Sequence, residues 1–534
     1  MGRKLPDPSL KERAPRRLRT GWLLCSSSAI GLLGGCSDET LAPVYPTEQL
    51  VAGNATVTVS TEPSLLLQQG GETLLSFDAR ALQLGVVDEV SDGTNYDPYR
   101  LYVAHAAYQP PDDLAWTSPT QARFADDDGY DTTLALELDY GAGKHATLTV
   151  DVAGDGRFSL RLTPSGTRTA FLRLRPRASA SEGFYGLGEV FDDVNHRGKV
   201  RAMQLETDSS LESLYNEAHV PVPLLVGTRG WGWFVESPYP GVFSVAVDDD
   251  RLIEAAFGTG VASTEGLAFH LFAADHPLDV TRHYYEVTGY PKLPARWALG
   301  PWIWRDENDD QAQVESDLDT IRDLDLATTG YWIDRPYATA VNTFDFASAQ
   351  FPDPAAMVGK LHDLGFRTAL WHTPYLDEGD SATEALRAEA EAEGYYPPKV
   401  GLPLNHWGKP FDVTNPDAVA WWQDLLSAYT DLGVAGFKLD YGEDVVAGLG
   451  NTRLAWEFAD GSDERTMQSQ FQRFYHRAYA EVLPDDGAFL LCRAGTYGDQ
   501  QNGVIIWPGD LDANLATHGE QIEDDGETYT AVGG

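Results

Sequence analysis

Carboxylates that directly follow short apolar segments are the residues of this chain best placed to do chemistry. The segment Val434–Leu439 has the composition of a buried strand and runs straight into Asp440. Thr329–Asp334 is a similar segment that itself ends on a carboxylate, and Asp510 closely follows a third. An α/β barrel places its catalytic groups at the C-terminal ends of its buried parallel strands. Asp440 could also begin an ordinary polar loop, so the surrounding residues must decide between these interpretations.

The elements that must position these carboxylates alternate between apolar segments and amphipathic helices. Apolar segments predict strands over 298–304, 329–334, 366–372, 434–439, 488–493 and 504–507. Helical spacing predicts helices over 311–326, 353–364, 381–393, 415–432 and 463–483. This alternation is typical of a parallel sheet, and we predict a (β/α)8 TIM barrel over residues 291–534. Because the pattern supplies about six of the eight strands, we expect a C-terminally incomplete barrel, truncated after the sixth strand.

Residues 51–290 show a different pattern, in which short alternating segments are separated by turns. Segments rich in Thr, Val and aromatic residues, such as 55–60, 147–152 and 267–272, are broken by Gly, Asp and Pro. This pattern predicts an N-terminal antiparallel β-sandwich domain. Within it, Gly183–Phe191 alternates glycines with aromatic residues but lacks the spacing of a phosphate-binding loop. We expect a tight turn that packs aromatic side chains near a site.

The first 36 residues have the composition of an export signal. A basic stretch that includes Arg16 and Arg17 precedes the short apolar segment Trp22–Gly35, and Cys36 follows it. This order is typical of a bacterial lipoprotein signal, which is cut before a cysteine that then carries lipid; a plain secretory signal is the alternative. We therefore expect a signal over 1–36, a flexible tether over 37–50, and an exported protein that is lipid-anchored to a bacterial cell-envelope membrane.

Charge and cysteine content exclude several kinds of partner and site. The chain has 81 acidic and 39 basic side chains, a net charge of −42. Such a surface repels nucleic-acid phosphates, so we expect no nucleic-acid partner. Of the three cysteines, Cys492 alone would remain beside the lipidated Cys36, so we expect no disulfide and no thiolate metal cluster. We also predict no cofactor.

The side chains at the predicted C-terminal strand ends would meet on one face of the barrel. They are aromatic, acidic and basic residues: Trp304, Arg305, Asp334, Trp371, His372, Asp440, Arg493, Trp507 and Asp510. Carboxylates and arginine hydrogen-bond to sugar hydroxyls, and a pair of carboxylates can cleave a glycosidic bond. A divalent metal held by Asp334, Asp440 and His372 is a lesser alternative. The sequence contains neither a serine nucleophile elbow nor a His-Glu-x-x-His motif.

Short segments that follow one another along the chain resemble glycoside hydrolase family 31, which includes α-glucosidases and α-xylosidases. They are Phe-Tyr-Gly-Leu-Gly-Glu (184–189), Trp-Ala-Leu-Gly (297–300), Tyr-Trp-Ile-Asp (331–334), Phe-Pro-Asp-Pro (351–354), Leu-Gly-Phe-Arg-Thr-Ala-Leu-Trp (364–371), Thr-Asn-Pro (414–416), Gly-Phe-Lys-Leu-Asp-Tyr-Gly-Glu (436–443) and Trp-Pro-Gly-Asp (507–510). The resemblance implies a β-sandwich followed by a (β/α)8 barrel. It also implies a retaining α-glycosidase that hydrolyses terminal α-linked sugars, such as α-glucosides, through a covalent glycosyl-aspartate intermediate.

The resemblance further implies roles for individual residues. The aspartate that matches Asp440 is the nucleophile, and the one that matches Asp510 is the general acid/base. The positions that would bind the sugar, together with the tryptophan beside the acid/base, are Asp334, Trp371, Lys438, Arg493 and Trp507. Lys438 and Arg493 would favour an ionised Asp440, and the apolar wall beside Asp510 would favour its protonated form. A retaining pair of this kind lies about 5–5.5 Å apart.

Other functions stay open at this point. The segment Arg335-Pro336-Tyr337 matches no substrate subgroup of the family, and the Gln-Asp-Trp-Ser-Gly segment of sulfoquinovosidases is absent after the second strand. A transglycosidase or an α-glucan lyase would share the first chemical step. The incomplete barrel also allows a non-catalytic surface lipoprotein that binds glycans. Carbohydrate is the expected partner in each case, besides the membrane that holds the lipid.

Overall fold

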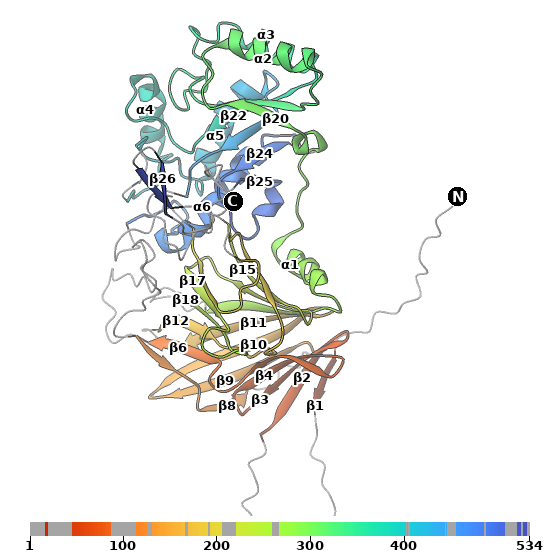
Figure 1. Ribbon diagram of the computed structural model, residues 1–534. Coiled ribbons are helices and arrows are strands. Elements are labelled where there is room, and N and C mark those ends of the chain that lie inside the picture. The colour runs from red at the N-terminus through yellow and green to blue at the C-terminus, as the bar shows by residue number, and fades with distance from the viewer. Residues whose placement is uncertain are drawn as a thin grey trace, which may run out of the picture.

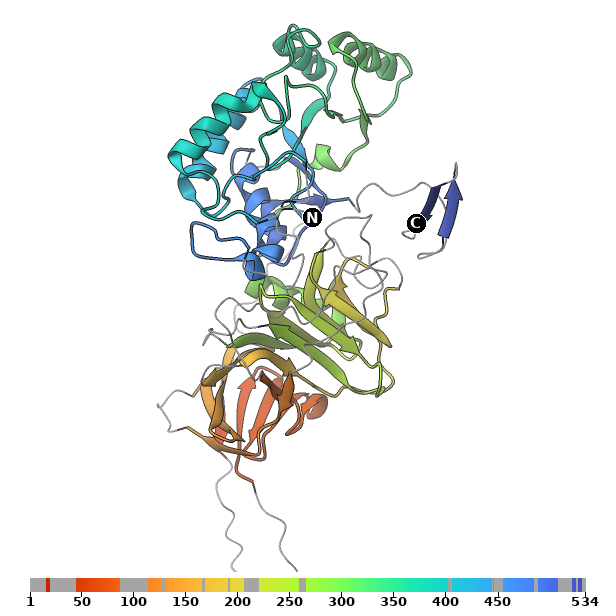
Figure 2. The ribbon, with the colours of Figure 1, turned by 90° about the vertical axis from the view of Figure 1, so that its left-hand side faces the viewer.

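A computed structural model describes residues 45–86, 114–125, 131–165, 169–190, 193–205, 220–258, 266–401, 403, 406–443, 445, 455–484 and 488–507, and the backbone of 16–19, 521–524 and 527–530. The described chain forms a β-rich N-terminal half and an α/β C-terminal half, stacked end to end (Figure 1). The side view shows the same two halves, with the helices gathered in the C-terminal one (Figure 2).

Three antiparallel sheets build the N-terminal half. The first has the order β1 (Arg16–Arg19), β2 (Thr47–Ala52), β3 (Ala55–Ser60), β4 (Ser64–Gln69) and β5 (Glu72–Phe77). The second has the order β13 (Phe184–Gly188), β15 (Pro221–Gly227), β16 (Trp231–Glu236), β19 (Leu267–Ala273), β11 (Arg157–Ser165), β10 (Lys144–Gly154), β9 (Thr133–Gly141) and β8 (Gln121–Phe124). The third has the order β14 (Lys199–Met203), β17 (Gly241–Val245), β18 (Ile253–Gly258), β12 (Thr169–Leu174), β6 (Leu82–Val86) and β7 (Ala115–Thr117).

Alternation of apolar and polar residues explains why these strands stack into a sandwich. Along β9, every second side chain is buried, so Leu134, Leu136 and Leu138 face the core while their neighbours face outward. One continuous apolar core links the sheets and includes Trp231 and Trp233. The predicted β-sandwich is therefore confirmed as a fold class.

The N-terminal sheet extends further toward the start of the chain than the sequence suggested. Strand β2 begins at Thr47 and buries Leu50, so the last residues of the segment 37–50, expected to be a tether, belong to the sheet. An alternating segment that can bury apolar side chains such as Leu50 gains more from pairing than from solvation. The edge strand β1 falls inside the segment 1–36 that we predict to be a signal, and it pairs with β2.

The C-terminal half follows a short helical connection, η2 (Pro277–Asp279), α1 (Val280–Thr288) and η3 (Arg296–Leu299). Its parallel sheet has the order β20 (Trp302–Arg305), β21 (Gly330–Ile333), β22 (Arg367–His372), β23 (Gly436–Leu439), β24 (Phe489–Cys492) and β25 (Ile505–Ile506). The crossovers contain α2 (Gln311–Asp323), α3 (Pro354–Asp363), η4 (Ser381–Thr383), α4 (Glu384–Glu393), α5 (Pro416–Thr430), α6 (Glu464–Ala480) and η5 (Asp499–Asn502). A hairpin of β26 (Gln521–Asp524) and β27 (Glu527–Thr530) follows.

Local sequence explains where these helices begin. Asp310, Asp353, Asn415 and Asp463 each accept a hydrogen bond from a backbone N–H of the first helical turn. The predicted strand start that differs most from the structure is that of 298–304, because η3 occupies residues up to Leu299 and the strand begins at Trp302. The Gly300-Pro301 pair separates the two, since proline cannot continue a hydrogen-bonded helix.

The six described parallel strands form the barrel part of the predicted fold, in sequence order. Large aromatic side chains fill its interior, where the Trp302 and Phe489 rings stack with their centroids 3.9 Å apart. Strands β20 and β25 are the two edges of this described sheet. Within the described residues, no helix is both long and apolar enough to cross a bilayer.

Candidate active site

Asp440 is the residue around which the polar side chains at the strand ends gather. It follows β23 directly, and its side chain is buried. The indole Nε1 of Trp371, at the end of the neighbouring strand β22, donates a hydrogen bond to Asp440 Oδ2 at 2.9 Å. The Asp440 Oδ1 atom accepts hydrogen bonds from the backbone N–H of Tyr441 at 3.0 Å and from the guanidinium of Arg493 at 3.3 Å. Both oxygens are therefore held in place from three sides.

Lys438 places a buried positive charge between two carboxylates. It precedes Asp440 by two residues, so both side chains lie on the same face of the sheet. Its Nζ lies 3.1 Å from Asp334 Oδ2 and 3.6 Å from Asp440 Oδ2. The rings of Trp304 and Trp507 lie 5.4 Å and 5.3 Å from the same ammonium, which places the cation between two aromatic side chains.

The turn after the nucleophile candidate adds a second ion pair. Tyr441 has a φ of 58° and Gly442 a φ of 99°, and this turn brings Glu443 back toward Arg493. The Arg493 Nε lies 3.1 Å from Glu443 Oε1, so one guanidinium contacts both Asp440 and Glu443. A Cβ on Gly442 would lie only 2.7 Å from the Gln472 side chain, and the close packing here requires glycine.

Burial and a neighbouring positive charge shift the pKa of Asp334 in opposite directions. Burial raises the pKa of this carboxyl above its usual value, and the nearby Lys438 ammonium lowers it only in part. The Asp334 Oδ1 atom also accepts the backbone N–H of Arg335 at 3.0 Å. Asp334 is thus a buried hydrogen-bonding group beside Asp440, and a polyhydroxylated ligand could exchange hydrogen bonds with it.

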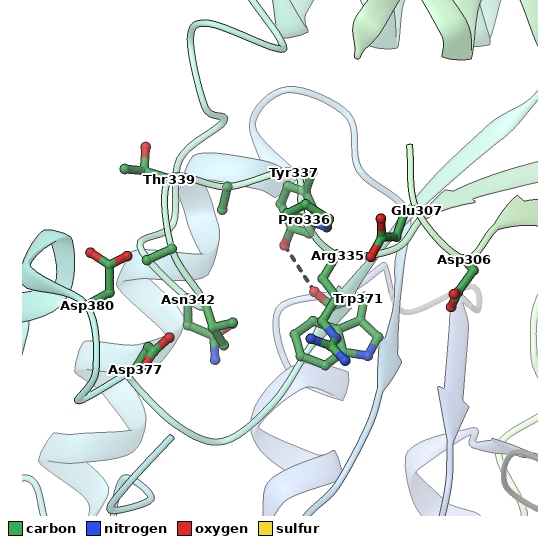
Figure 3. A pocket seen from close by; sticks show the side chains of 13 residues that line it. Asp306, Glu307, Arg335, Pro336, Tyr337, Thr339, Asn342, Trp371, Asp377 and Asp380 are labelled. Atoms are coloured by element: carbon green, nitrogen blue, oxygen red, sulfur yellow. Dashed lines mark hydrogen bonds between the residues drawn. The ribbon is translucent and has the colours of Figure 1, made fainter. Parts of the chain in front are cut away.

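An open cavity of about 350 Å³ lies beside these residues. Figure 3 shows Trp371 and Arg335 among the residues that line it, and the Tyr337 hydroxyl donates a hydrogen bond to the Trp371 carbonyl at 3.1 Å. Its volume falls within the range of small-molecule sites, about 300–1,000 Å³. The cluster of charged and aromatic side chains around Asp440 and the adjacent cavity together provide buried charges, aromatic faces and room for a sugar.

Comparison with known proteins decides which family this site belongs to. Residues 291–530 match the sequence profile of the glycosyl hydrolases family 31 TIM-barrel domain. These residues belong to glycoside hydrolase family 31. The match covers all six barrel strands and every site residue named above.

Curated proteins match a larger part of the chain. The alpha-xylosidase XylQ of Lactiplantibacillus pentosus is 27% identical over 344 residues, covering 61% of this chain and 42% of its own length. The isomaltosyltransferase of Sporosarcina globispora is 26% identical over 386 residues, covering 64% of this chain and 34% of its own. This chain thus spans less than half the length of either protein.

Solved structures show that the fold is shared across both halves. A family 31 sulfoquinovosidase from E. rectale superimposes with a TM-score of 0.64 at 17% identity, over 85% of this chain and 69% of that one. The family 31 dextranase of Flavobacterium johnsoniae gives a TM-score of 0.59 at 18% identity, over 88% of this chain and 56% of that one. At this identity the likeness shows the fold alone.

The family 31 site brings together most of the residues predicted from sequence. Side chains of Asp334, Trp371, Lys438, Asp440, Arg493 and Trp507 lie in one cluster. Asp510, the predicted acid/base, and Cys36, the predicted lipidation site, lie outside the described residues. The roles of all of these residues stay predictions.

Two residues that we expected beside Asp440 at the C-terminal strand ends have side chains that point away from it. His372 faces the surrounding helices, where its Nδ1 lies 3.1 Å from the Tyr479 hydroxyl, because successive side chains of a strand point to opposite faces. Burial lowers the pKa of His372 to about 3, so the ring is neutral. Arg305 forms a bidentate pair with Asp317 of α2, at 2.6 Å and 2.8 Å. Neither residue can join Asp334 and Asp440 around a metal or a sugar.

Sequence reasoning gave no role to three residues that the structure places at the site. Glu443 was part of the resembling segment, and its position three residues after Asp440 was a usable signal. Arg335 directly follows Asp334, which was also a usable signal. Trp407 gave none, because it reaches Trp371 from a loop and only the fold brings the two rings to 5.9 Å.

Proposed function

We propose that the chain is a retaining α-glycosidase that hydrolyses terminal α-linked sugars, with Asp440 as its nucleophile. The observation that carries this proposal is the set of donors on Asp440: an indole N–H, a guanidinium and a nearby ammonium, all on buried or half-buried side chains. Together these groups fix the orientation of the buried carboxylate. A carboxylate fixed in this way can attack an anomeric carbon.

In the proposed reaction, the Asp440 carboxylate forms a bond to the anomeric carbon while the glycosidic bond breaks. Asp510 donates its proton to the departing oxygen, which leaves as an alcohol. Water, deprotonated by Asp510, then attacks the anomeric carbon, releases the sugar and frees the Asp440 carboxylate. Asp334 and Lys438 would hold the sugar hydroxyls, with Trp371 and Arg493 holding Asp440 in position.

The names of the similar proteins suggest which sugar is bound, but they differ in the molecule to which that sugar is transferred. Their names include alpha-xylosidase and alpha-glucosidase, which release sugar to water, and isomaltosyltransferase, which names a transfer. We propose hydrolysis of an α-glucoside or an α-xyloside as the main reaction. Transfer to a second sugar would use the same glycosyl-Asp440 intermediate, and product analysis by NMR distinguishes free from transferred sugar.

Substitution of the nucleophile tests the proposal directly. Asp440→Ala is expected to abolish release of 4-nitrophenol from 4-nitrophenyl α-glucoside and α-xyloside. Added azide should restore turnover in this variant and yield the β-glycosyl azide, because the small anion takes the place of the missing carboxylate. Near-wild-type release by Asp440→Ala would contradict the proposal, and glycan binding without turnover by the wild-type chain would favour a binding protein.

We also propose two domains that divide between residues 290 and 291, the first of which includes β2 from Thr47 on. A separate proposal is export with lipidation at Cys36. The basic and apolar order of residues 1–36 and the cysteine that ends it support the second proposal. Cells expressing the full chain with an alkyne-labelled fatty acid should incorporate the label, and Cys36→Ser should remove it. Label retained by Cys36→Ser would contradict the anchor.

A further inference from the structure

One side of helix α6 carries buried polar side chains that the proposed reaction does not use. Gln468, Gln472 and His476 follow one another at intervals of four residues, so they lie along the same face of the helix. They are 3%, 0% and 0% exposed, respectively. A helix face that only packs against a core carries apolar residues at such positions. Because buried polar groups are hydrogen-bonded, these side chains need partners in the segments that α6 contacts.

The first two of these side chains reach the sandwich and the turn after the nucleophile. Gln468 Nε2 donates a hydrogen bond to the Leu205 carbonyl at 3.2 Å, which joins α6 to the N-terminal half of the molecule (Figure 1). The Gln472 amide packs against Gly442, the second residue after Asp440. A Cβ on that glycine would lie 2.7 Å from the amide Nε2 and 2.9 Å from Oε1. Gln472 therefore supports the turn that leads away from Asp440.

The third side chain, His476, is paired with the loop that follows Arg493. Its Nδ1 lies 2.7 Å from Oδ2 of Asp499, a residue that is 2% exposed. The same Oδ2 would lie 3.1 Å from a Cβ on Gly495, so this buried pair contacts the chain two residues after Arg493. Since the Arg493 guanidinium donates to Asp440, His476 helps to hold a segment that positions the nucleophile.

The polar ends of Gln472 and His476 need a partner that the described part of the chain does not supply. The Oε1 and Nε2 of Gln472 and the Nε2 of His476 are fully enclosed and make no hydrogen bond to any described residue. With the hydrogen on Nδ1 donated to Asp499, the Nε2 of a neutral imidazole accepts one. Proteins satisfy such buried groups with internal water. Residues four apart on a helix have Cβ atoms about 5–6 Å apart, so one water molecule can reach both side chains.

From this arrangement we propose that Gln472 and His476 bind one internal water molecule between them. The water links the turn after Asp440 to the loop after Arg493, so that both segments keep one fixed relation. Gln472 and His476 are positioning residues, because they act on the reaction through Asp440 and Arg493. The proposal rests on the proposed glycosidase function for its kinetic test and adds a structural water site to it.

A crystal structure of the wild-type chain tests the water site without an activity assay and without any variant. We expect density for one water molecule about 2.7–3.2 Å from His476 Nε2 and from an amide atom of Gln472. A direct hydrogen bond between the two side chains would overturn the proposal. So would a site in which neither side chain contacts water.

Two substitutions that each remove one partner of the water test whether the side chains act together. Gln472→Met removes the amide and keeps the length, and His476→Asn keeps an amide donor for Asp499 but loses Nε2. Each should lower kcat on a 4-nitrophenyl α-glycoside by roughly fivefold, the effect of one neutral hydrogen bond, with KM near wild type. Because both changes remove the same water, the double variant should also lose about fivefold, not about 25-fold. A multiplied loss, or wild-type kcat in both single variants, would overturn the shared site.

Gln468→Met is the matched control, one helical turn earlier on the same face. It removes the hydrogen bond to Leu205 and should lower the midpoint of urea unfolding while kcat per active site stays unchanged. Active sites are counted as the fraction of protein that a 5-fluoro-α-glycosyl fluoride labels, so unfolded protein does not lower kcat. An equal fall in kcat for Gln468→Met and Gln472→Met would overturn the positioning role. If the wild-type chain cleaves no glycosyl fluoride, the proposed function fails with that role, whereas the crystal structure still decides the water site.

Discussion

Two buried carboxylates, Glu182 in the sandwich and Asp440 in the barrel, have similar immediate surroundings. They are 3% and 5% exposed, respectively. Each accepts a hydrogen bond of 2.9 Å from an indole, Trp231 for Glu182 and Trp371 for Asp440. Each also accepts at least one backbone N–H, from Ser179 at 2.8 Å in the first case. Burial and an indole donor therefore do not distinguish a catalytic carboxylate from a structural one.

The two carboxylates differ in their charged neighbours and in what lies beside them. The described donors to the Glu182 carboxylate are neutral: one indole and the backbone N–H groups of Ser179 and Arg229. Asp440 has the side chains of Lys438 and Arg493 within 3.6 Å and 3.3 Å, and Trp371 borders the cavity. Neutral donors fix a turn, whereas the two cations at Asp440 hold a carboxylate beside an open cavity.

Matched substitution of the two carboxylates is expected to give the largest and most divergent effects. Asp440→Asn should lower kcat by about 10⁴-fold, the loss typical of a catalytic carboxylate, with a free energy of unfolding near wild type. Glu182→Gln should lower the free energy of unfolding by about 1–3 kcal/mol, because a buried donor loses its partner, and leave kcat of the folded protein unchanged. Release of 4-nitrophenol and urea unfolding measure the two quantities. Loss of kcat in folded Glu182→Gln would contradict the assignment of Glu182 as a purely structural carboxylate.

Removal of the buried cation should affect both activity and stability. Lys438→Met leaves Asp334 and Asp440 without their shared ammonium, so we expect a loss of about 3–5 kcal/mol in the free energy of unfolding. We also expect kcat to fall by about 100-fold or more, since a preorganised charge is lost. Lys360→Met is the control: Lys360 lies 2.9 Å from Asp319 on the surface, where a pair contributes about 0–1 kcal/mol. Equal losses of unfolding free energy and of kcat in both variants would show that the buried charge of Lys438 contributes no more than a surface charge.

The two indole donors allow a smaller, paired test. Trp371→Phe removes the N–H that positions Asp440, and kcat should fall by roughly tenfold with little change in the midpoint of unfolding. Trp231→Phe removes the equivalent N–H from Glu182 and should lower the midpoint of unfolding while kcat stays unchanged. Steady-state kinetics and thermal unfolding of both variants provide the measurement. A fall in the midpoint alone for Trp371→Phe would assign that tryptophan to the core.

His372 extends the comparison to a buried group that has no charged partner among the described residues. Burial lowers its pKa from 6.5 to about 3, so below pH 6.5 the unfolded chain binds a proton that the folded one does not. The free energy of unfolding should therefore fall as the pH drops from about 6.5 toward 3, by up to roughly 1.4 kcal/mol per pH unit from this group. Urea unfolding of His372→Asn at pH 7 and pH 5 should show a smaller difference than wild type. An identical difference would mean that the histidine is protonated in the fold.

Much of the site could be predicted from the sequence because strand ends are local features. The apolar segment before Asp440 and its two-residue spacing to Lys438 place both side chains on one face, as the structure shows. The same alternation explains why the prediction that His372 lies beside Trp371 at the site was wrong. The side chains of two consecutive strand residues point to opposite faces of the sheet. Arg305 and Trp407 could not be placed, because α2 supplies Asp317 and a loop supplies Trp407, and neither contact follows from local pattern.

A covalent trap of the intermediate tests the central claim most directly. The wild-type chain, incubated with the 5-fluoro derivative of the α-glycosyl fluoride that it cleaves, should accumulate a glycosyl-enzyme, because the fluorine slows hydrolysis of the intermediate more than it slows its formation. Mass spectrometry of the digested protein should find one added fluoroglycosyl group on the peptide that contains Asp440. A group attached to any other residue, or turnover of the unmodified sugar without a trapped adduct, would contradict the assignment of Asp440 as nucleophile.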